Sequence, residues 1–230
     1  MTRYNHSPLD ILKNMAFNHE DPMMTLQMKS FTEFRQLYEA ALREMQTKLN
    51  NLEAEFELRF DHKPIHHIES RIKEPHSIVS KLNRRGLDVS MASAMEHLDD
   101  IAGVRIVCPY VDDVYLVSEL LLSQDDIRLI RLSDYIKNPK ENGYRSVHIV
   151  LEVPVFLTIG KKYVRVEVQL RTIAMDFWAS LEHDIRYKRL ENTNREDLLL
   201  RLKLVAQKIH TLDKEMLKIF QDSRLFNENE

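Results

Sequence analysis

The chain has 230 residues, 43% of them hydrophobic and 30% charged, which is enough for one compact domain with a sizeable core and helical extensions. The formal net charge of −3 and the pI of about 6.4 argue against bulk, salt-dependent nucleic-acid binding as the main activity. Because no apolar stretch is long enough to span a membrane and the first 20 residues lack a signal-peptide pattern, we expect a soluble, cytoplasmic protein.

The N-terminal part of the chain is predicted to be helical. Residues 1–30 show weak periodicity, typical of a loosely attached helical segment. From Phe31 to Phe60, apolar residues alternate spacings of four and three, which predicts one long amphipathic helix. The elements expected next are a short helix or turn at 65–70, an extended piece at 71–73, and a helix that begins at Pro75 and stops near Gly86.

The middle of the chain contains β-branched or alternating apolar runs, which are typical of strands. The strands expected from these runs are Ile101–Pro109, Ile127–Leu132, Val147–Leu157 and Tyr163–Leu170. Helices are expected at 111–123, at 172–188 and from about Arg195 onward, the last with heptad spacing. The single cysteine, Cys108, falls in the first strand, where we expect a small buried thiol.

This pattern predicts an α+β fold, in which a mixed sheet of about five strands is flanked by helices from both termini. We expect an N-terminal helical segment at 1–60, a core at 61–190 and a C-terminal helix at 191–230. The chain has only four glycines and neither a Gly-x-Gly-x-x-Gly nor a Walker A pattern. Any bound phosphate is therefore expected to be held by side chains.

The first polar cluster, Arg71-x-Lys73-x-Pro75-x-Ser77-x-x-x-Lys81, combines cations with a predicted helix start. If Pro75 opens the helix, Ser77 and Lys81 lie one turn apart, near an N-terminus whose free N–H groups favour anions. Arg71 and Lys73 precede the helix on one side of an extended piece. The cluster suits a nucleotide triphosphate, and a basic helix start in solvent is the alternative.

Two predicted strands are associated with carboxylates. Asp100 stands just before a buried strand, where it can present a carboxylate to Mg²⁺ at the edge of the sheet, and Asp99 is the alternative. In the last strand, Glu167-x-Gln169-x-Arg171 places three polar side chains on one face, which lines a cleft or is simply half-exposed. If that face lines the cleft, Glu167 is a second carboxylate to meet Asp100. Facing carboxylates repel, so substitution of either is not expected to destabilise the fold.

The loop centred on Pro139-Lys140-Glu141-Asn142-Gly143-Tyr144 lies between two predicted strands and mixes cations, an amide and an aromatic ring. A plain hairpin needs Asn142-Gly143, but it does not need Lys140, Tyr144 and His148 around them. Tyr144 can stack on a purine while Lys140 meets its phosphates. The loop is therefore predicted to bind a nucleotide.

Together, these clusters resemble the synthetase domain of the RelA/SpoT alarmone enzymes, and specifically the single-domain small alarmone synthetases. The resemblance covers roughly residues 60–190 and includes Met175-x-x-Trp178-Ala179-x-Leu181-Glu182-His183. Asn142 makes the loop more similar to the RelP subgroup than to RelQ. The resemblance implies a nucleotidyltransferase-like sheet and a GTP pyrophosphokinase. Such an enzyme transfers the β,γ-diphosphate of ATP to the 3′-hydroxyl of GDP or GTP and releases AMP.

The resemblance also implies roles for individual residues. Those expected to bind ATP are Arg71, Lys73, Ser77, Lys81 and Arg105, with the two arginines on either side of adenine. Those expected to bind GDP or GTP are Arg131, Lys137, Lys140, Asn142, Tyr144, Ser146, His148 and Gln169. Asp100 and Glu167 are expected to hold Mg²⁺, and Glu167 is expected to help remove the 3′-hydroxyl proton.

The separate hydrolase domain of larger family members is not matched, so the resemblance implies alarmone synthesis without hydrolysis. It also implies a homotetramer, for which the two heptad helices offer surfaces, although these helices could instead pack within one chain. A nucleotidyltransferase that releases pyrophosphate normally shows Asp-x-Asp, which this sequence lacks. The acidic pI and the paired carboxylates argue against a catalytically silent nucleotide- or RNA-binding module, and leave RNA only as a regulator.

Overall fold

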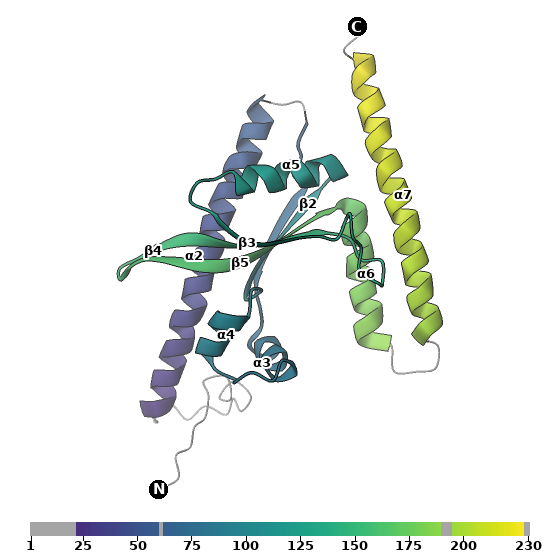
Figure 1. Cartoon of the computed structure of the whole chain (residues 1–230). Helices are drawn as coiled ribbons and strands as arrows, with labels where there is room; N and C mark the ends of the chain where they lie inside the picture. The colour runs from purple at the N-terminus through teal and green to yellow at the C-terminus, as the bar shows by residue number, and fades with distance from the viewer. Residues whose placement is uncertain (1–21, 60–61, 190–194, 228–230) are drawn as a thin grey trace.

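The structure is a computed structural model that describes residues 22–59, 62–189 and 195–227 (Figure 1). Most of the loosely attached segment predicted for 1–30 lies outside these ranges. The helices are α2 (Pro22–Arg59), α3 (Pro75–Arg84), α4 (Met91–His97), α5 (Val111–Leu122), α6 (Ile173–Arg189) and α7 (Arg195–Asn227). The strands are β1 (His67–Ile72), β2 (Ala102–Cys108), β3 (Arg128–Asp134), β4 (Val147–Leu157) and β5 (Gly160–Thr172). Within the described ranges, no helix is long and apolar enough to cross a membrane.

The strands form one mixed sheet in the order β1-β2-β5-β4-β3. β2 and β5 run parallel, and the other neighbouring pairs are antiparallel. The predicted α+β fold with about five strands is therefore confirmed. The short helix or turn predicted at 65–70 is wrong, because β1 is an edge strand that pairs with β2. A helix was predicted because the apolar residues in and just before β1, Ile65, Ile68 and Ile72, have the three-and-four spacing of a helix.

One face of the sheet encloses the hydrophobic core together with helices α2 and α5 (Figure 1). Val104, Val166 and Ile149 come from three adjacent strands and are at most 2% exposed. Met45 and Leu49 of α2 are fully buried in the same core. Burial of each such side chain contributes about 1.5–3 kcal/mol to folding. Because successive side chains of a strand point to opposite faces, the polar residues that alternate with these apolar ones face away from the core.

Helix α2 confirms the long amphipathic helix predicted from Phe31, although it begins earlier, at Pro22. Tyr38 and Phe56, near the two ends of the predicted apolar stripe, are both buried. The predicted burial of Cys108 is also confirmed, because its side chain has no exposed surface.

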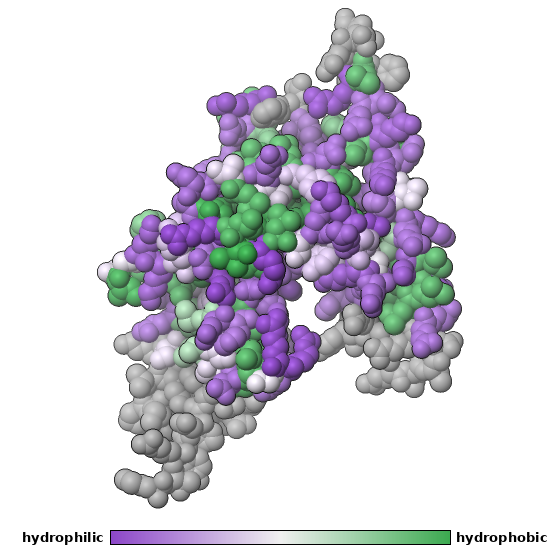
Figure 2. Space-filling view, viewed as in Figure 1, coloured by the Kyte–Doolittle hydropathy of each residue, from purple (hydrophilic) through white to green (hydrophobic). Residues whose placement is uncertain are grey.

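The heptad stripe predicted in the last helix is only partly covered. Helix α7 packs mainly against α6 and α5. Ala206 is buried there, but Leu212, Met216 and Ile219 are each more than half exposed. Figure 2 shows a largely hydrophilic surface with exposed apolar side chains on its right-hand side, where α7 lies in Figure 1.

Candidate active site

The register of the sheet brings several predicted residues onto the polar face. Arg71 of β1 lies opposite Gly103 of β2, which in turn lies opposite Glu167 of β5. Two residues further along β2, Arg105 lies opposite Gln169. Because Gly103 has no side chain, Arg71 and Glu167 border an open space between them. The pocket on this face is lined by Glu69, Arg71, Asp100, Gly103, Val104, Arg105, Glu167 and Gln169.

Asp100, just before β2, binds two lysines of the first polar cluster. Its Oδ2 lies 3.0 Å from Lys73 Nζ and 2.7 Å from Lys81 Nζ. Lys81 belongs to α3, whose predicted start at Pro75 is confirmed and brings this lysine to the carboxylate. Burial alone would raise the pKa of Asp100, but the two lysines outweigh it and hold the pKa below its ordinary value. Asp100 is therefore ionised at neutral pH.

The other oxygen of Asp100 is left without a partner. Oδ1 is buried and has no hydrogen bond among the described residues. Asp99 differs, because its Oδ2 lies 2.9 Å from Arg131 Nη2 and its Oδ1 lies 3.4 Å from Arg165 Nη1. Of the two aspartates that the sequence left open, Asp100 is the one that lines the pocket.

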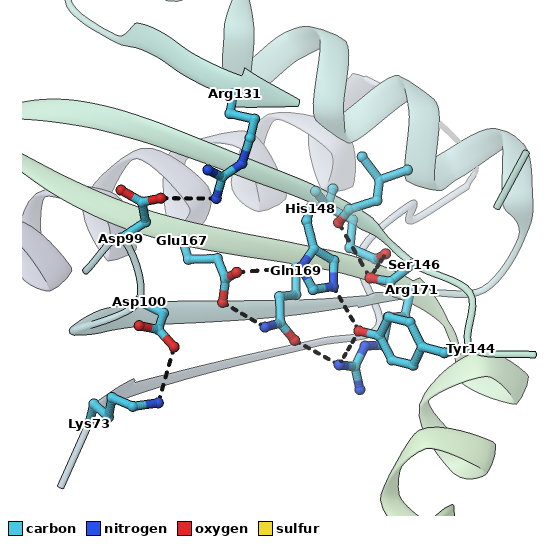
Figure 3. A network of polar contacts seen from close by, with 12 residues as sticks. Lys73, Asp99, Asp100, Arg131, Tyr144, Ser146, His148, Glu167, Gln169 and Arg171 are labelled. Carbon is cyan, nitrogen blue, oxygen red and sulfur yellow. Dashed lines mark hydrogen bonds and ion pairs between the residues drawn. The ribbon is translucent and has the colours of Figure 1, made fainter. Parts of the chain in front are cut away.

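Glu167 on β5 has a polar partner at each carboxylate oxygen (Figure 3). Oε2 accepts a hydrogen bond from Gln169 Nε2 at 2.8 Å, and Oε1 lies 3.4 Å from His148 Nδ1. Burial would raise the pKa of Glu167, as does the nearby Asp100 carboxylate, but His148 and Gln169 together hold it below its ordinary value. Asp100 and Glu167 are therefore both ionised and separately stabilised.

The loop between β3 and β4 contacts both C-terminal helices, α6 and α7. Asn142 Oδ1 accepts a hydrogen bond from the backbone N–H of Tyr144 at 3.2 Å, and its Nδ2 donates to Glu182 of α6 at 3.1 Å. Gly143 has a φ of +91°, and a Cβ atom at this position would lie 2.6 Å from Ala206 Cβ in α7. Only glycine fits this close approach and this backbone conformation.

Tyr144 lies between two cations at the end of this loop. Its ring centroid is 4.8 Å from Lys140 Nζ and 5.3 Å from Arg171 Cζ. Its hydroxyl accepts a hydrogen bond from Arg171 Nη2 at 2.8 Å and lies 2.7 Å from His148 Nε2. Burial raises the pKa of Tyr144, so the phenol keeps its proton at neutral pH.

Of the predicted site residues, Arg71, Asp100, Arg105, Glu167 and Gln169 line the pocket, and the other ten do not. Three of these ten contact residues outside it. Ser146 is fully buried, and its hydroxyl donates to a backbone carbonyl of β5 at 2.9 Å. Lys137 is exposed, with its Nζ 3.6 Å from Asp134. Ser77 is half-buried in α3, and its hydroxyl lies 3.2 Å from His76 Nε2. Contact of all the predicted site residues with a nucleotide stays a prediction.

Two further residues join the network and were not among the predicted site residues. Arg171 is 5% exposed, and its Nη1 donates to Asp176 Oδ1 at 3.1 Å. The same oxygen of Asp176 lies 3.7 Å from Arg105 Nε, so the carboxylate links guanidinium groups from two strands. The alternation of polar residues along β5 placed Arg171 on the same face as Glu167 and Gln169, but no role was assigned to it. Nothing in the sequence indicates Asp176, which comes from the first turn of α6.

Comparison with known proteins identifies the family. The sequence model of the region found in RelA/SpoT proteins matches residues 70–192. GTP pyrophosphokinase YwaC of Bacillus subtilis (strain 168) is 43% identical over 206 residues, which cover 90% of this chain and 97% of YwaC. The chain belongs to the RelA/SpoT family. A second RelA/SpoT relative, GTP pyrophosphokinase YjbM of the same strain, is 38% identical over 83% of this chain and 89% of YjbM.

A solved RelA/SpoT structure agrees with this assignment. The crystal structure of the small alarmone synthetase 1 from Bacillus subtilis bound to its product pppGpp superposes with a TM-score of 0.77. It is 37% identical and covers 84% of this chain and 98% of its own. This chain is thus a small alarmone synthetase of the GTP pyrophosphokinase class.

Proposed function

We propose that the chain is a cytoplasmic, Mg²⁺-dependent enzyme that binds ATP together with GDP or GTP at this pocket. It transfers the β,γ-diphosphate of ATP to the 3′-hydroxyl of the guanosine nucleotide, giving (p)ppGpp and AMP. The proposal depends above all on the meeting of two ionised carboxylates, Asp100 and Glu167, on a face rich in cations. The GTP pyrophosphokinase relatives and the pppGpp bound to one of them support the same reaction.

The transfer makes one bond and breaks one. The 3′-oxygen bonds to the β-phosphorus of ATP, and the oxygen that bridges to the α-phosphate leaves with the bonding electrons as part of AMP. The 3′-hydroxyl proton passes to Glu167, which is ionised and can therefore accept it. Such a transfer depends mainly on in-line positioning and on neutralisation of phosphate charge. The cations of the pocket are therefore as important as the base.

The residues present fit a magnesium ion. Asp100 offers an ionised carboxylate with one buried oxygen that has no hydrogen-bond partner among the residues that the structure describes. No group of three or more metal-ligating side chains occurs in the part of the chain that the structure describes, but Mg²⁺ commonly takes one or two carboxylates together with substrate phosphates. Asp100 and Glu167 would hold the ion. When bound, Mg²⁺ neutralises developing charge on the phosphates.

ATP is assigned to the side of the pocket formed by β1, β2 and α3. Arg71 and Arg105 both line the pocket, and guanidinium planes suit stacking on a purine. Lys73 and Lys81 converge on Asp100, so their ammonium groups are available to phosphates beside the metal. Ser77 lies in the same helix as Lys81, and its hydroxyl is the remaining donor assigned to ATP.

The guanosine nucleotide is assigned to the side formed by β4 and the loop before it. The Tyr144 ring offers a stacking surface, and Lys140 lies over that ring, near the phosphates of a stacked nucleotide. The other residues assigned to this nucleotide are Arg131, Lys137, Asn142, Ser146, His148 and Gln169.

A homotetramer formed through the C-terminal helix α7 is also proposed, because the predicted stripe of α2 packs within one chain and leaves Tyr38 and Phe56 buried. Leu212, Met216 and Ile219 are exposed at heptad spacing on α7, which suits helix-to-helix contact between chains. Sedimentation analysis of the wild-type chain and of Leu212→Glu tests this assembly. We expect a four-chain mass for the wild type and a smaller mass for the variant, whereas a monomeric wild type would contradict the proposal.

Steady-state synthesis by Glu167→Gln and Asp100→Asn tests the catalytic assignment, with Glu152→Gln as a matched control. Glu152 is on the same sheet face and pairs with Arg165 at 3.9 Å, but it does not line the pocket. We expect the first two variants to lower turnover about a hundredfold or more, because metal and general-base contributions are each of that order. The control should match the wild type. Full activity of a folded Glu167→Gln would contradict the assignment.

A further inference from the structure

We infer that Arg171 is a positioning residue for the transfer, because it closes a ring of polar side chains that aligns Glu167 with Tyr144. The inference rests on the proposed role of Glu167 as proton acceptor. Arg171 does not line the pocket and is almost fully buried. It therefore acts through its neighbours and not by touching a nucleotide.

The ring can be followed from one side chain to the next in Figure 3. Arg171 Nη2 donates to Gln169 Oε1 at 2.6 Å, and Gln169 Nε2 donates to Glu167 Oε2 at 2.8 Å. The other carboxylate oxygen, Glu167 Oε1, lies 3.4 Å from His148 Nδ1. His148 Nε2 lies 2.7 Å from the Tyr144 hydroxyl, which accepts from Arg171 Nη2 at 2.8 Å. One nitrogen of Arg171 thus begins and ends the ring.

Arg171 decides which way the Gln169 amide points. A guanidinium has only donors, so the atom of Gln169 that meets it must be the carbonyl oxygen. The amide NH₂ is then turned toward Glu167 and donates to it. With the amide reversed, a carbonyl oxygen would face the carboxylate, and no hydrogen bond could form.

A matching proton arrangement completes the other side of the ring. The Tyr144 oxygen accepts from Arg171, and its own hydrogen can be donated to His148 Nε2, which lies 2.7 Å away. With Nε2 as the acceptor, a neutral His148 carries its hydrogen on Nδ1, 3.4 Å from Glu167 Oε1. In this arrangement each carboxylate oxygen of Glu167 faces one donor, and the remaining lone pairs are available to the 3′-hydroxyl proton.

Arg171 is itself held by an anchor outside the ring. Its Nη1 donates to Asp176 of α6, and the guanidinium is buried between β5 and that helix. Because its position is fixed, a displaced Tyr144 ring changes the contacts of both Arg171 and His148. Glu167 is therefore correctly oriented only when the tyrosine that stacks on the guanine is in place.

Arg171→Lys and Arg171→Met, compared with wild type in kcat and in the KM for each nucleotide, test the inference. Lysine keeps the charge but lacks the planar fork with which arginine reaches Asp176 through Nη1 while Nη2 closes the ring. We expect kcat to fall about tenfold or more, with the KM for ATP close to wild type and any change in the KM for the guanosine nucleotide smaller than the change in kcat.

Two more variants separate a positioning role from a structural one. Arg145 is a half-buried arginine that donates to the backbone carbonyl of Ile136 and lies outside the ring. Arg145→Met should lower thermal stability at most and leave kcat unchanged. Tyr144→Phe opens the ring at the phenol but keeps the stacking surface, so it should lower kcat with little change in the KM for the guanosine nucleotide, even where the Arg171 variants do not fold.

These outcomes distinguish a failure of the proposed ring from a failure of the proposed function. A fall in kcat that exceeds the change in either KM, absent in Arg145→Met, supports the ring. Wild-type kcat in Tyr144→Phe and in the folded Arg171 variants overturns it, provided that Glu167→Gln is inactive. Activity of Glu167→Gln overturns the proposed function itself.

Discussion

Replacement of Asp100 by asparagine removes the charge on which two lysines converge. Both ammonium groups bind the same oxygen, at 3.0 and 2.7 Å, and the carboxylate is 19% exposed. Because a hydrogen bond to a charged group contributes about 1.5–3 kcal/mol and asparagine can retain one of them in neutral form, we expect a loss of about 1–2 kcal/mol in unfolding free energy. The loss of a metal ligand should lower turnover about a hundredfold, or about 2.7 kcal/mol of transition-state stabilisation.

The stability difference should depend on pH with a definite sign. The pKa of Asp100 in the folded chain is below its ordinary value, because the lysines outweigh burial. Its contribution to stability is therefore fully present above the unfolded-state pKa of about 3.9 and is lost as pH falls through the lower folded-state pKa. Urea unfolding of the wild type and Asp100→Asn should give curves that differ at pH 7 and converge as the pH falls below the unfolded-state pKa.

AMP release measured against Mg²⁺ concentration tests the catalytic part of this prediction. Asp100→Asn should need more Mg²⁺ and turn over more slowly. The control is Asp99→Asn, whose carboxylate pairs with Arg131 and Arg165 and does not line the pocket. It should keep the wild-type Mg²⁺ dependence. An essential Asp99 beside a dispensable Asp100 would refute the assigned metal site.

Three further substitutions have defined outcomes. Tyr144→Ala should raise the KM for the guanosine nucleotide, since base stacking is worth about 1–3 kcal/mol, and titration calorimetry should find ATP binding nearly unchanged. Arg71→Lys should weaken ATP more than GTP in the same titrations, because an ammonium cannot stack as a guanidinium does. Gly143→Ala should lower the unfolding free energy by about 1–3 kcal/mol, because its Cβ would meet Ala206 at a positive φ. Thermal melts check this with Gly86→Ala as the control. Gly86 also has a positive φ, +67°, but an added Cβ would meet no atom of the described residues within 4 Å apart from its chain neighbours, so the loss of unfolding free energy should be smaller.

Most elements of the fold could be predicted because apolar periodicity records which face is buried. β4 has the predicted bounds, Val147–Leu157, since its core-facing residues alternate with others. Most of β1 was predicted as a short helix or turn because its few apolar residues have helical spacing, and only the extended piece predicted at 71–73 overlaps its end. α4, Met91–His97, was not predicted, since seven residues are too few for a period to show.

The residues of the site could be predicted better than their contacts. Alternation along strands indicates that Glu167 and Gln169 share a face. The expectation that Asp100 and Glu167 repel was made without their partners, which come from other elements such as α3 and β4. Ser146 has the chemistry of a nucleotide-binding loop, but pairing of β4 with β5 buries its hydroxyl against a carbonyl. Such contacts depend on strand pairing, which local patterns do not encode.

Separation of the products formed from ATP and GDP in the presence of Mg²⁺ tests the central claim most directly. The wild-type chain should give AMP and guanosine 3′,5′-bis(diphosphate) in equal amounts, and Glu167→Gln should give almost none of either. Release of pyrophosphate with transfer of a nucleotidyl group would contradict it, as would the same yield of AMP and alarmone from Glu167→Gln as from the wild type.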